Sequence, residues 1–189
     1  FRNHYCSDGE IDFLRHGYGL SRADYLKAIK FPDPMTAPGP SIRAGDFAEI
    51  LVADYLEFVL SLWVPRTRYA DKTVRNESEK GCDVIGFYQV RPDSDSKEDA
   101  LYVFEVKAQF SGKTDEDRLQ KAVNDSVKDQ IRRAESLNAI KQRLWHKDIA
   151  SARRIERFQN PNDKPYKEIS GAAAVLESAM YDEKTIAKT

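Results

Sequence analysis

The sequence has little cysteine, little histidine and no excess of either charge. Its 189 residues include 2 cysteines and 3 histidines. Cys6 and Cys82 are too few for a disulfide framework, and the histidines lack the spacing of zinc ligands. Lys and Arg number 30 against 31 Asp and Glu, which gives a formal net charge of −1. The chain therefore lacks the positive field of a free-standing nucleic-acid binder, so binding to a polyanion has to be local or delegated to a partner.

Long apolar runs and several common catalytic signatures are also missing. No run of about 18 apolar residues and no signal-like segment is present, so we expect a cytoplasmic protein that does not enter a membrane. The absence of a glycine-rich phosphate loop, of GxSxG and of HExxH gives little support to P-loop enzymes, serine hydrolases or zinc proteases. The chain opens at Phe1 rather than at Met, and whether it is part of a longer protein stays open.

Helices are predicted on both sides of the proline-rich stretch FPDPMTAPGP, residues 31–40. The stretch itself predicts a loop. Residues 21–29 predict a short helix with Ser21 as its N-cap. Residues 41–63 repeat apolar side chains at helical spacing, including Val52, Leu56 and Val59, and predict a long helix.

The second half of the chain predicts strands followed by helices. Residues 66–70, 81–90 and 101–110 are short segments that predict three consecutive strands with hairpin-type connections. Residues 115–145 return to helical spacing, and one side of that helix is predicted to be apolar: Leu119, Val123, Val127, Ile131, Ala134 and Leu137. We expect a further helix between residues 146 and 158 and a weakly helical segment at 167–180, and no strand is evident after residue 145.

This order predicts an α/β fold in which a small mixed sheet is flanked by helices. We expect one domain over residues 1–189, with a helical and loop elaboration at 1–40, a core at 41–145 and a helical part at 146–189. A last core strand is not found and could lie beyond residue 189.

The strand LYVFEVKAQF, residues 101–110, carries two charges on a face that begins as apolar. Because strand side chains alternate, Glu105 and Lys107 share a face with Leu101, Val103 and Gln109, and they lie about 6.7 Å apart along the strand. A solvated ion pair is one interpretation. The charges begin where the buried part of the face ends, however, and charged groups at a core edge usually pair or coordinate a ligand.

A second carboxylate belongs to the preceding strand. If residues 81–90 and 101–110 pair as antiparallel neighbours, Asp83 can lie level with Glu105. Two carboxylates this close repel unless a cation lies between them, and hard oxygen ligands suit Mg²⁺ or Mn²⁺. The alternative is a structural aspartate at the start of the strand, after Gly81.

A third carboxylate, Glu49, falls within the apolar arc of the long helix, beside Val52 and Leu56. A buried carboxylate needs a partner, which a metal site would supply if this helix packs on the sheet that carries Asp83 and Glu105. The alternative is a bond from Glu49 to Arg43 or to a backbone amide.

A helix acid, a strand Asp and a Glu-x-Lys on the next strand together resemble the PD-D/ExK nuclease superfamily, whose restriction-endonuclease-like core runs helix, three strands, helix, strand. The resemblance covers about residues 41–145, with Cys82 where the name-giving proline would stand. It implies catalytic roles for Glu49, Asp83, Glu105 and Lys107, and metal binding by the three acids.

Longer phrases, among them WVPRTRY, RNESEKGCDVIGF and FEVKAQFSG, are similar to the nuclease effector subunit of Hachiman anti-phage defence systems. That resemblance implies a Mg²⁺- or Mn²⁺-dependent enzyme that cleaves DNA with low sequence specificity and works with a superfamily 2 helicase. The candidate DNA-binding residues near the motifs are Gln109, Arg75, Lys80, Lys113 and Arg118. Two alternatives stay open: a non-catalytic subunit that binds DNA or a partner, and a site-specific restriction endonuclease.

Overall fold

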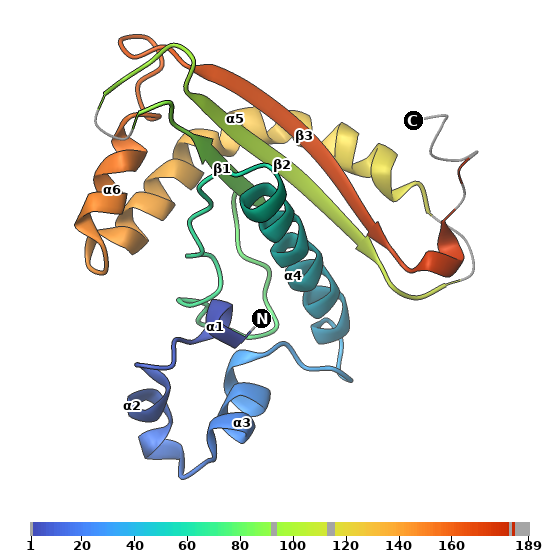
Figure 1. Ribbon diagram of the computed structural model, residues 1–189. Helices are drawn as coiled ribbons and strands as arrows, with labels where there is room; N and C mark the ends of the chain where they lie inside the picture. Colours follow the sequence, from blue (N-terminus) through green and yellow to red (C-terminus); the bar gives the residue numbers. More distant parts are fainter. Residues whose placement is uncertain (1, 92–93, 113–115, 182, 184–189) are drawn as a thin grey trace. The chain divides into compact units, whose positions relative to one another are not determined.

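The computed structural model describes residues 2–91, 94–112, 116–181 and 183 (Figure 1). The fold is mixed α/β, because helices pack against a small three-stranded sheet with the strand order β1-β2-β3. The chain forms two compact units. One consists of Phe1–Phe47 and Arg66–Lys80, and the other of Ala48–Pro65 and Gly81–Thr189.

The first unit is built from short helices around a small apolar core. Its helical elements are α1 (Arg2–Tyr5), α2 (Ile11–Arg15), η1 (His16–Tyr18), α3 (Arg22–Tyr25), η2 (Leu26–Lys30) and the first part of α4 (Gly39–Asp54). The predicted N-cap is confirmed, since the Ser21 side chain accepts a hydrogen bond from the Asp24 amide. Asp46 is buried in this unit, where Lys72 and the Tyr5 hydroxyl donate hydrogen bonds to its carboxylate.

The second unit contains the sheet. β1 (Val84–Tyr88) pairs antiparallel with β2 (Ala100–Gln109), and β3 (Lys167–Leu176) pairs parallel with β2. Figure 1 shows β2 between the other two strands. The remaining elements are the end of α4, its continuation η3 (Tyr55–Val59), α5 (Arg118–Trp145), α6 (Ile149–Glu156) and η4 (Ser178–Met180). The helices predicted at 41–63, at 115–145 and between 146 and 158 are therefore confirmed.

The two faces of the sheet pack against different helices. Even-numbered residues of β2, such as Phe104 and Val106, pack with Val52 of α4 and Leu56 of η3. Odd-numbered residues at the start of β2, Leu101 and Val103, pack with residues of α5 and α6: Leu137, Ile140, Leu144 and Ile155. The alternation of β2 thus separates two cores, as strand geometry requires.

The prediction of a helix at residues 167–180, with no strand after residue 145, was wrong, because residues 167–176 form β3. Alanine favours helices, and Gly171 carries no side chain to mark a strand face, so local propensity pointed away from a strand. Pairing with β2 along the whole of β3 overrides that propensity. The strand that the sequence did not reveal is therefore present at residues 167–176.

The predicted strand at residues 66–70 was also wrong. This segment carries no strand, and residues 68–70 form a turn. Its buried aromatic side chain, Tyr69, stacks on Tyr5 within the first unit instead of joining the sheet. The sheet is extended on the β1 side only by an isolated antiparallel bridge between Trp63 and Phe87, as far as the described residues go.

The predicted apolar side of α5 was wrong in part. Leu137 is buried, but Val123 and Val127 are exposed, and Ile131 is 84% exposed. The buried positions of the helix are Ala122, Asp129, Ser136 and Leu137. Small and polar side chains therefore face the sheet, which hydrophobic spacing alone does not reveal.

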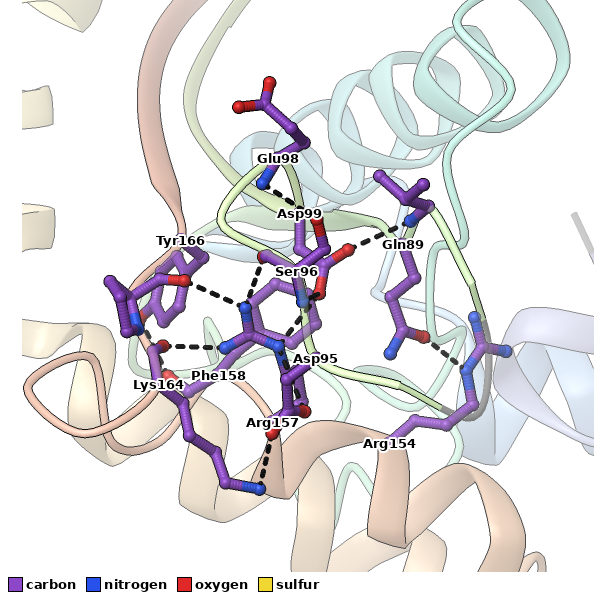
Figure 2. A network of polar contacts seen from close by, with 12 residues as sticks. Gln89, Asp95, Ser96, Glu98, Asp99, Arg154, Arg157, Phe158, Lys164 and Tyr166 are labelled. Atoms are coloured by element: carbon purple, nitrogen blue, oxygen red, sulfur yellow. Dashed lines mark hydrogen bonds and ion pairs between the residues drawn. The ribbon is translucent and has the colours of Figure 1, made fainter.

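A buried arginine joins the loops at one end of the sheet (Figure 2). Arg157, just after α6, donates hydrogen bonds to the carboxylate of Asp99 and to the carbonyl oxygens of Ser96, Lys164 and Pro165. Asp99 is fully buried and also accepts from backbone amides at Val90 and Ser96. This network ties the β1–β2 connection to the segment that leads into β3.

Candidate functional site

Asp83 directly precedes β1 and lies beside the end of its ladder with β2. The β1–β2 ladder pairs Val84 with Phe104 and Ile85 with Val103, and that register continued by one residue sets Asp83 opposite Glu105. Directly opposed residues of antiparallel strands point to the same face. The continued register thus places the two residues beside each other, and the meeting of their carboxylates at one point stays a prediction.

Asp83 also has a structural role at the start of β1. Its Oδ2 atom accepts a hydrogen bond from the Val106 amide at 2.9 Å, beyond the last pair of the β1–β2 ladder. The strand-start interpretation is thus present in the structure. A carboxylate has about four lone-pair sites, so this hydrogen bond does not by itself exclude a bound cation.

Lys107 lies between two carboxylates from different elements. Its ammonium donates to Oε1 of Glu105 on its own strand and contacts Oδ2 of Asp125, on α5, at 2.9 Å. Asp125 Oδ1 in turn accepts from Lys128 at 2.5 Å. The i, i+2 ion pair considered from the sequence exists, and Asp125 is a member of the cluster that sequence reasoning missed.

The charge states of this cluster follow from its contacts. Hydrogen bonds from Lys128 and Lys107 lower the pKa of the Asp125 carboxyl to about 2. Burial alone would lower the pKa of Lys107, but hydrogen bonds to Glu105 and Asp125 outweigh burial and raise that pKa. Lys107 therefore carries a positive charge at neutral pH and compensates the carboxylates around it.

Small residues border the charged pair on the β3 side. In the parallel register Ala172 is the partner of Glu105, and Ala174 is the partner of Lys107. Paired residues of neighbouring strands share a face, so methyl groups are all that β3 presents beside the two charges. A ligand over Glu105 and Lys107 would meet no bulky side chain from these two positions of β3.

Glu49 is buried, with 8% of its surface exposed, as its place on the helix predicts. Its neighbours Ala48, Val52 and Ala53 pack in the cluster with Val84 and Val106, which is the sheet face opposite to Glu105. Within the described residues, no three His, Cys, Asp or Glu side chains converge as metal ligands. The structure thus pairs Asp83 with Glu105 in register and does not gather Glu49 with them in a metal cluster.

Gln109 is buried and hydrogen-bonds to described residues that follow β2. Its Oε1 atom accepts from the Glu116 amide and from Arg118 Nε, and its Nε2 atom donates to the Ser111 carbonyl. Although it ends β2, Gln109 is therefore not an exposed residue. Its amide contacts the chain itself, and a role in binding phosphate or water stays a prediction.

The candidate basic residues are spread over both units. Arg75 and Lys80 belong to the first unit, where Arg75 pairs with Asp33 at 2.8 Å. Arg118 belongs to the second and pairs with Glu116 at 2.8 Å. Lys113 lies outside the described residues. Binding of DNA by any of these residues stays a prediction.

With this geometry in place, the comparison with protein families is decisive. The profile of the HamA family matches residues 1–189. The chain belongs to the HamA family. Members of this family are components of the Hachiman anti-phage defence system, so the resemblance seen in the sequence is confirmed at the level of the family. No curated protein matches the chain.

The donor set of this HamA-family chain is suited to a hard divalent cation. Mg²⁺ is commonly held by one or two carboxylates, with water and substrate phosphate as the remaining ligands. Asp83, which directly precedes β1, and Glu105 of β2 provide two such carboxylates. Within the part of the chain that the structure describes, no helix is long and apolar enough to cross a membrane.

Proposed function

We propose that the chain is the nuclease effector of its Hachiman system: a Mg²⁺- or Mn²⁺-dependent enzyme of restriction-endonuclease-like fold that cleaves DNA phosphodiester bonds with low sequence specificity. One observation carries the proposal. The β1–β2 register continued by one residue sets Asp83 opposite Glu105, and Lys107 follows two residues later on β2 with its ammonium at the Glu105 carboxylate.

Each residue has a chemical task in this proposal. Asp83 and Glu105 would hold the ion, whereas Glu49 matches the helix acid of the superfamily pattern but is flanked by residues that pack on the other face of the sheet. When bound, the ion polarises the scissile phosphate and lowers the pKa of the attacking water. The Lys107 ammonium orients that water and offsets the negative charge that grows on the phosphate in the transition state.

Affinity for DNA would come largely from a partner. Release of counterions by basic residues supplies most of the sequence-independent affinity for DNA, and a chain of net charge −1 has no general excess of such residues. We therefore propose that a helicase subunit of the system delivers DNA to the site. Cleavage at the phosphodiester backbone needs no base contacts, in keeping with low sequence specificity.

A non-catalytic binding subunit is the second candidate. It is favoured by the hydrogen bond of Asp83 to Val106 and by the ion pair of Glu105 with Lys107, because both contacts also serve the fold without any metal.

The two candidates differ in a cleavage assay. Plasmid and linear DNA are incubated with the chain, with and without the helicase, in Mg²⁺ or in EDTA. The nuclease proposal expects Glu105→Gln and Lys107→Ala each to lower the cleavage rate about 100-fold or more. Glu98→Gln, at an exposed carboxylate of the same unit, is the matched control and should cleave normally. Cleavage that survives both site substitutions would rule out this site, and absence of cleavage under every condition would favour the binding subunit.

A further inference from the structure

Asp125 reaches the candidate site from a different element than the residues of the nuclease pattern. It lies on α5, three residues after Ala122, which is fully buried, and four before the buried Asp129. Residues three and four apart share a helix face, so Asp125 lies at the border of the packed side of α5. From there its Oδ2 atom contacts Lys107 Nζ at 2.9 Å.

Lys107 needs such a contact in order to hold one position. A lysine side chain has four rotatable bonds, and its ammonium is a compact charge without preferred direction. The ion pair with Glu105 joins two residues of the same strand and by itself would let the ammonium move around that carboxylate. A second carboxylate, carried by a packed helix, restricts the ammonium to the space between α5 and β2.

Lys128 compensates the negative charge of Asp125. It is mostly exposed and contacts the other oxygen of Asp125 at 2.5 Å. Glu105 and Asp125 contribute two negative charges, and Lys107 and Lys128 contribute two positive ones. Asp125 can therefore hold Lys107 without adding a net negative charge where a phosphate would have to approach.

We propose that Asp125 is a positioning residue for Lys107: it holds the ammonium over the Glu105 carboxylate and so makes assembly of the site depend on the packing of α5. The proposal rests on the proposed function, in which Lys107 acts on the water or phosphate. The two oxygens of Asp125 contact Lys107 and Lys128, so its effect on the reaction passes through Lys107.

The test compares Asp125→Asn, which keeps the shape and removes the charge, with Asp125→Glu, which restores the charge. Glu135→Gln, at an exposed position of the same helix, is the matched control. The first readout is the ¹H–¹⁵N signal of the Lys107 ammonium in the 189-residue chain, assigned by its loss in Lys107→Ala. We expect Asp125→Asn to shift or broaden this signal, and Asp125→Glu and Glu135→Gln to leave it largely in place.

The second readout is DNA cleavage by the chain with its helicase in Mg²⁺. We expect Asp125→Asn to lower kcat about 10- to 100-fold, as loss of an orienting partner commonly does, with little change in KM for DNA and with partial recovery in Asp125→Glu. An unchanged ammonium signal, or a changed signal with normal kcat, would overturn the proposal. If the wild-type chain cleaves nothing while Asp125→Asn still moves the signal, the proposed function fails and the contact stands.

Discussion

Gly171 of β3 lies beside Phe104 of β2 in the parallel register, and a Cβ atom on Gly171 would lie 2.4 Å from two atoms of the Phe104 ring. The ring itself packs against the cluster formed with the end of α4. The glycine therefore allows an aromatic side chain to lie across the neighbouring strand and close that core.

We expect Gly171→Ala to lower the free energy of unfolding by about 1–3 kcal/mol, because the added methyl group has to displace a packed ring. Gly45→Ala in α4 is the matched control: a Cβ there has no atom within 4 Å, and the change should stabilise the helix by about 0.5–1 kcal/mol. Urea unfolding measures both. Adding Phe104→Leu should recover part of the loss, and an equally stable Gly171→Ala variant would show that the ring moves freely.

The network around Arg157 should be more important for stability than the surface ion pairs near it. Asp99→Asn leaves a buried guanidinium without its buried carboxylate, and we expect a loss of about 3–5 kcal/mol in the free energy of unfolding. The neighbouring Glu98→Gln removes only an exposed pair with Lys167 and should cost less than about 1 kcal/mol. Similar values for the two variants would contradict the burial of the network.

Substitutions on the buried and the exposed side of α5 should change the free energy of unfolding by very different amounts. Leu137→Ala should cost about 2–5 kcal/mol, because Leu137 is packed against Ile85, Val103 and Phe158 and its loss leaves a cavity. Ile131→Ala should change the free energy of unfolding by about 0.5 kcal/mol or less, since Ile131 is exposed. Thermal and urea unfolding of the isolated chain would distinguish them. A large loss for Ile131→Ala would support the helix face predicted from the sequence.

Cys82 makes the stability sensitive to alkaline pH. Burial raises the pKa of its thiol from 9.0 to about 11. Between these values the unfolded chain has lost the proton and the folded chain still binds it, so the thiol's contribution is complete below the lower pKa and is lost as pH rises through the upper one. The free energy of unfolding should therefore fall more steeply from about pH 9 to pH 11 in the wild-type chain than in Cys82→Ala. Parallel slopes would contradict the burial of this thiol.

The parts of the fold that the sequence predicted are those with strong local patterns. The amphipathic α4, the long α5 and the hairpin of β1 and β2 follow from periodicity, and the buried position of Glu49 follows from its place among the apolar residues of α4. The register that sets Asp83 beside Glu105 follows from the hairpin. These features depend on residues that are near one another in the sequence or that repeat with one period.

The parts that could not be predicted depend on distant pairing. β3 is rich in Ala and contains Gly171, so its conformation is determined by β2 and not by its own propensity. The packed side of α5 includes Asp129 and Ser136, which no apolar pattern identifies. Asp125 joined the site only through the packing of α5 on the sheet, and an aspartate on a charged helix gives no local signal for such a role.

The parallel pairing of β2 with β3 also affects when the sheet can be completed as the chain folds. β2 carries Glu105 and Lys107, yet its partner on one side begins only at Lys167, after both α5 and α6. A growing chain that has reached α6 would hold every charged residue of the site while one long edge of β2 still lacked its strand, and such edges readily pair with other chains. We therefore expect the site strand to be completed late in folding, so that a competent cluster forms only when the sheet has closed.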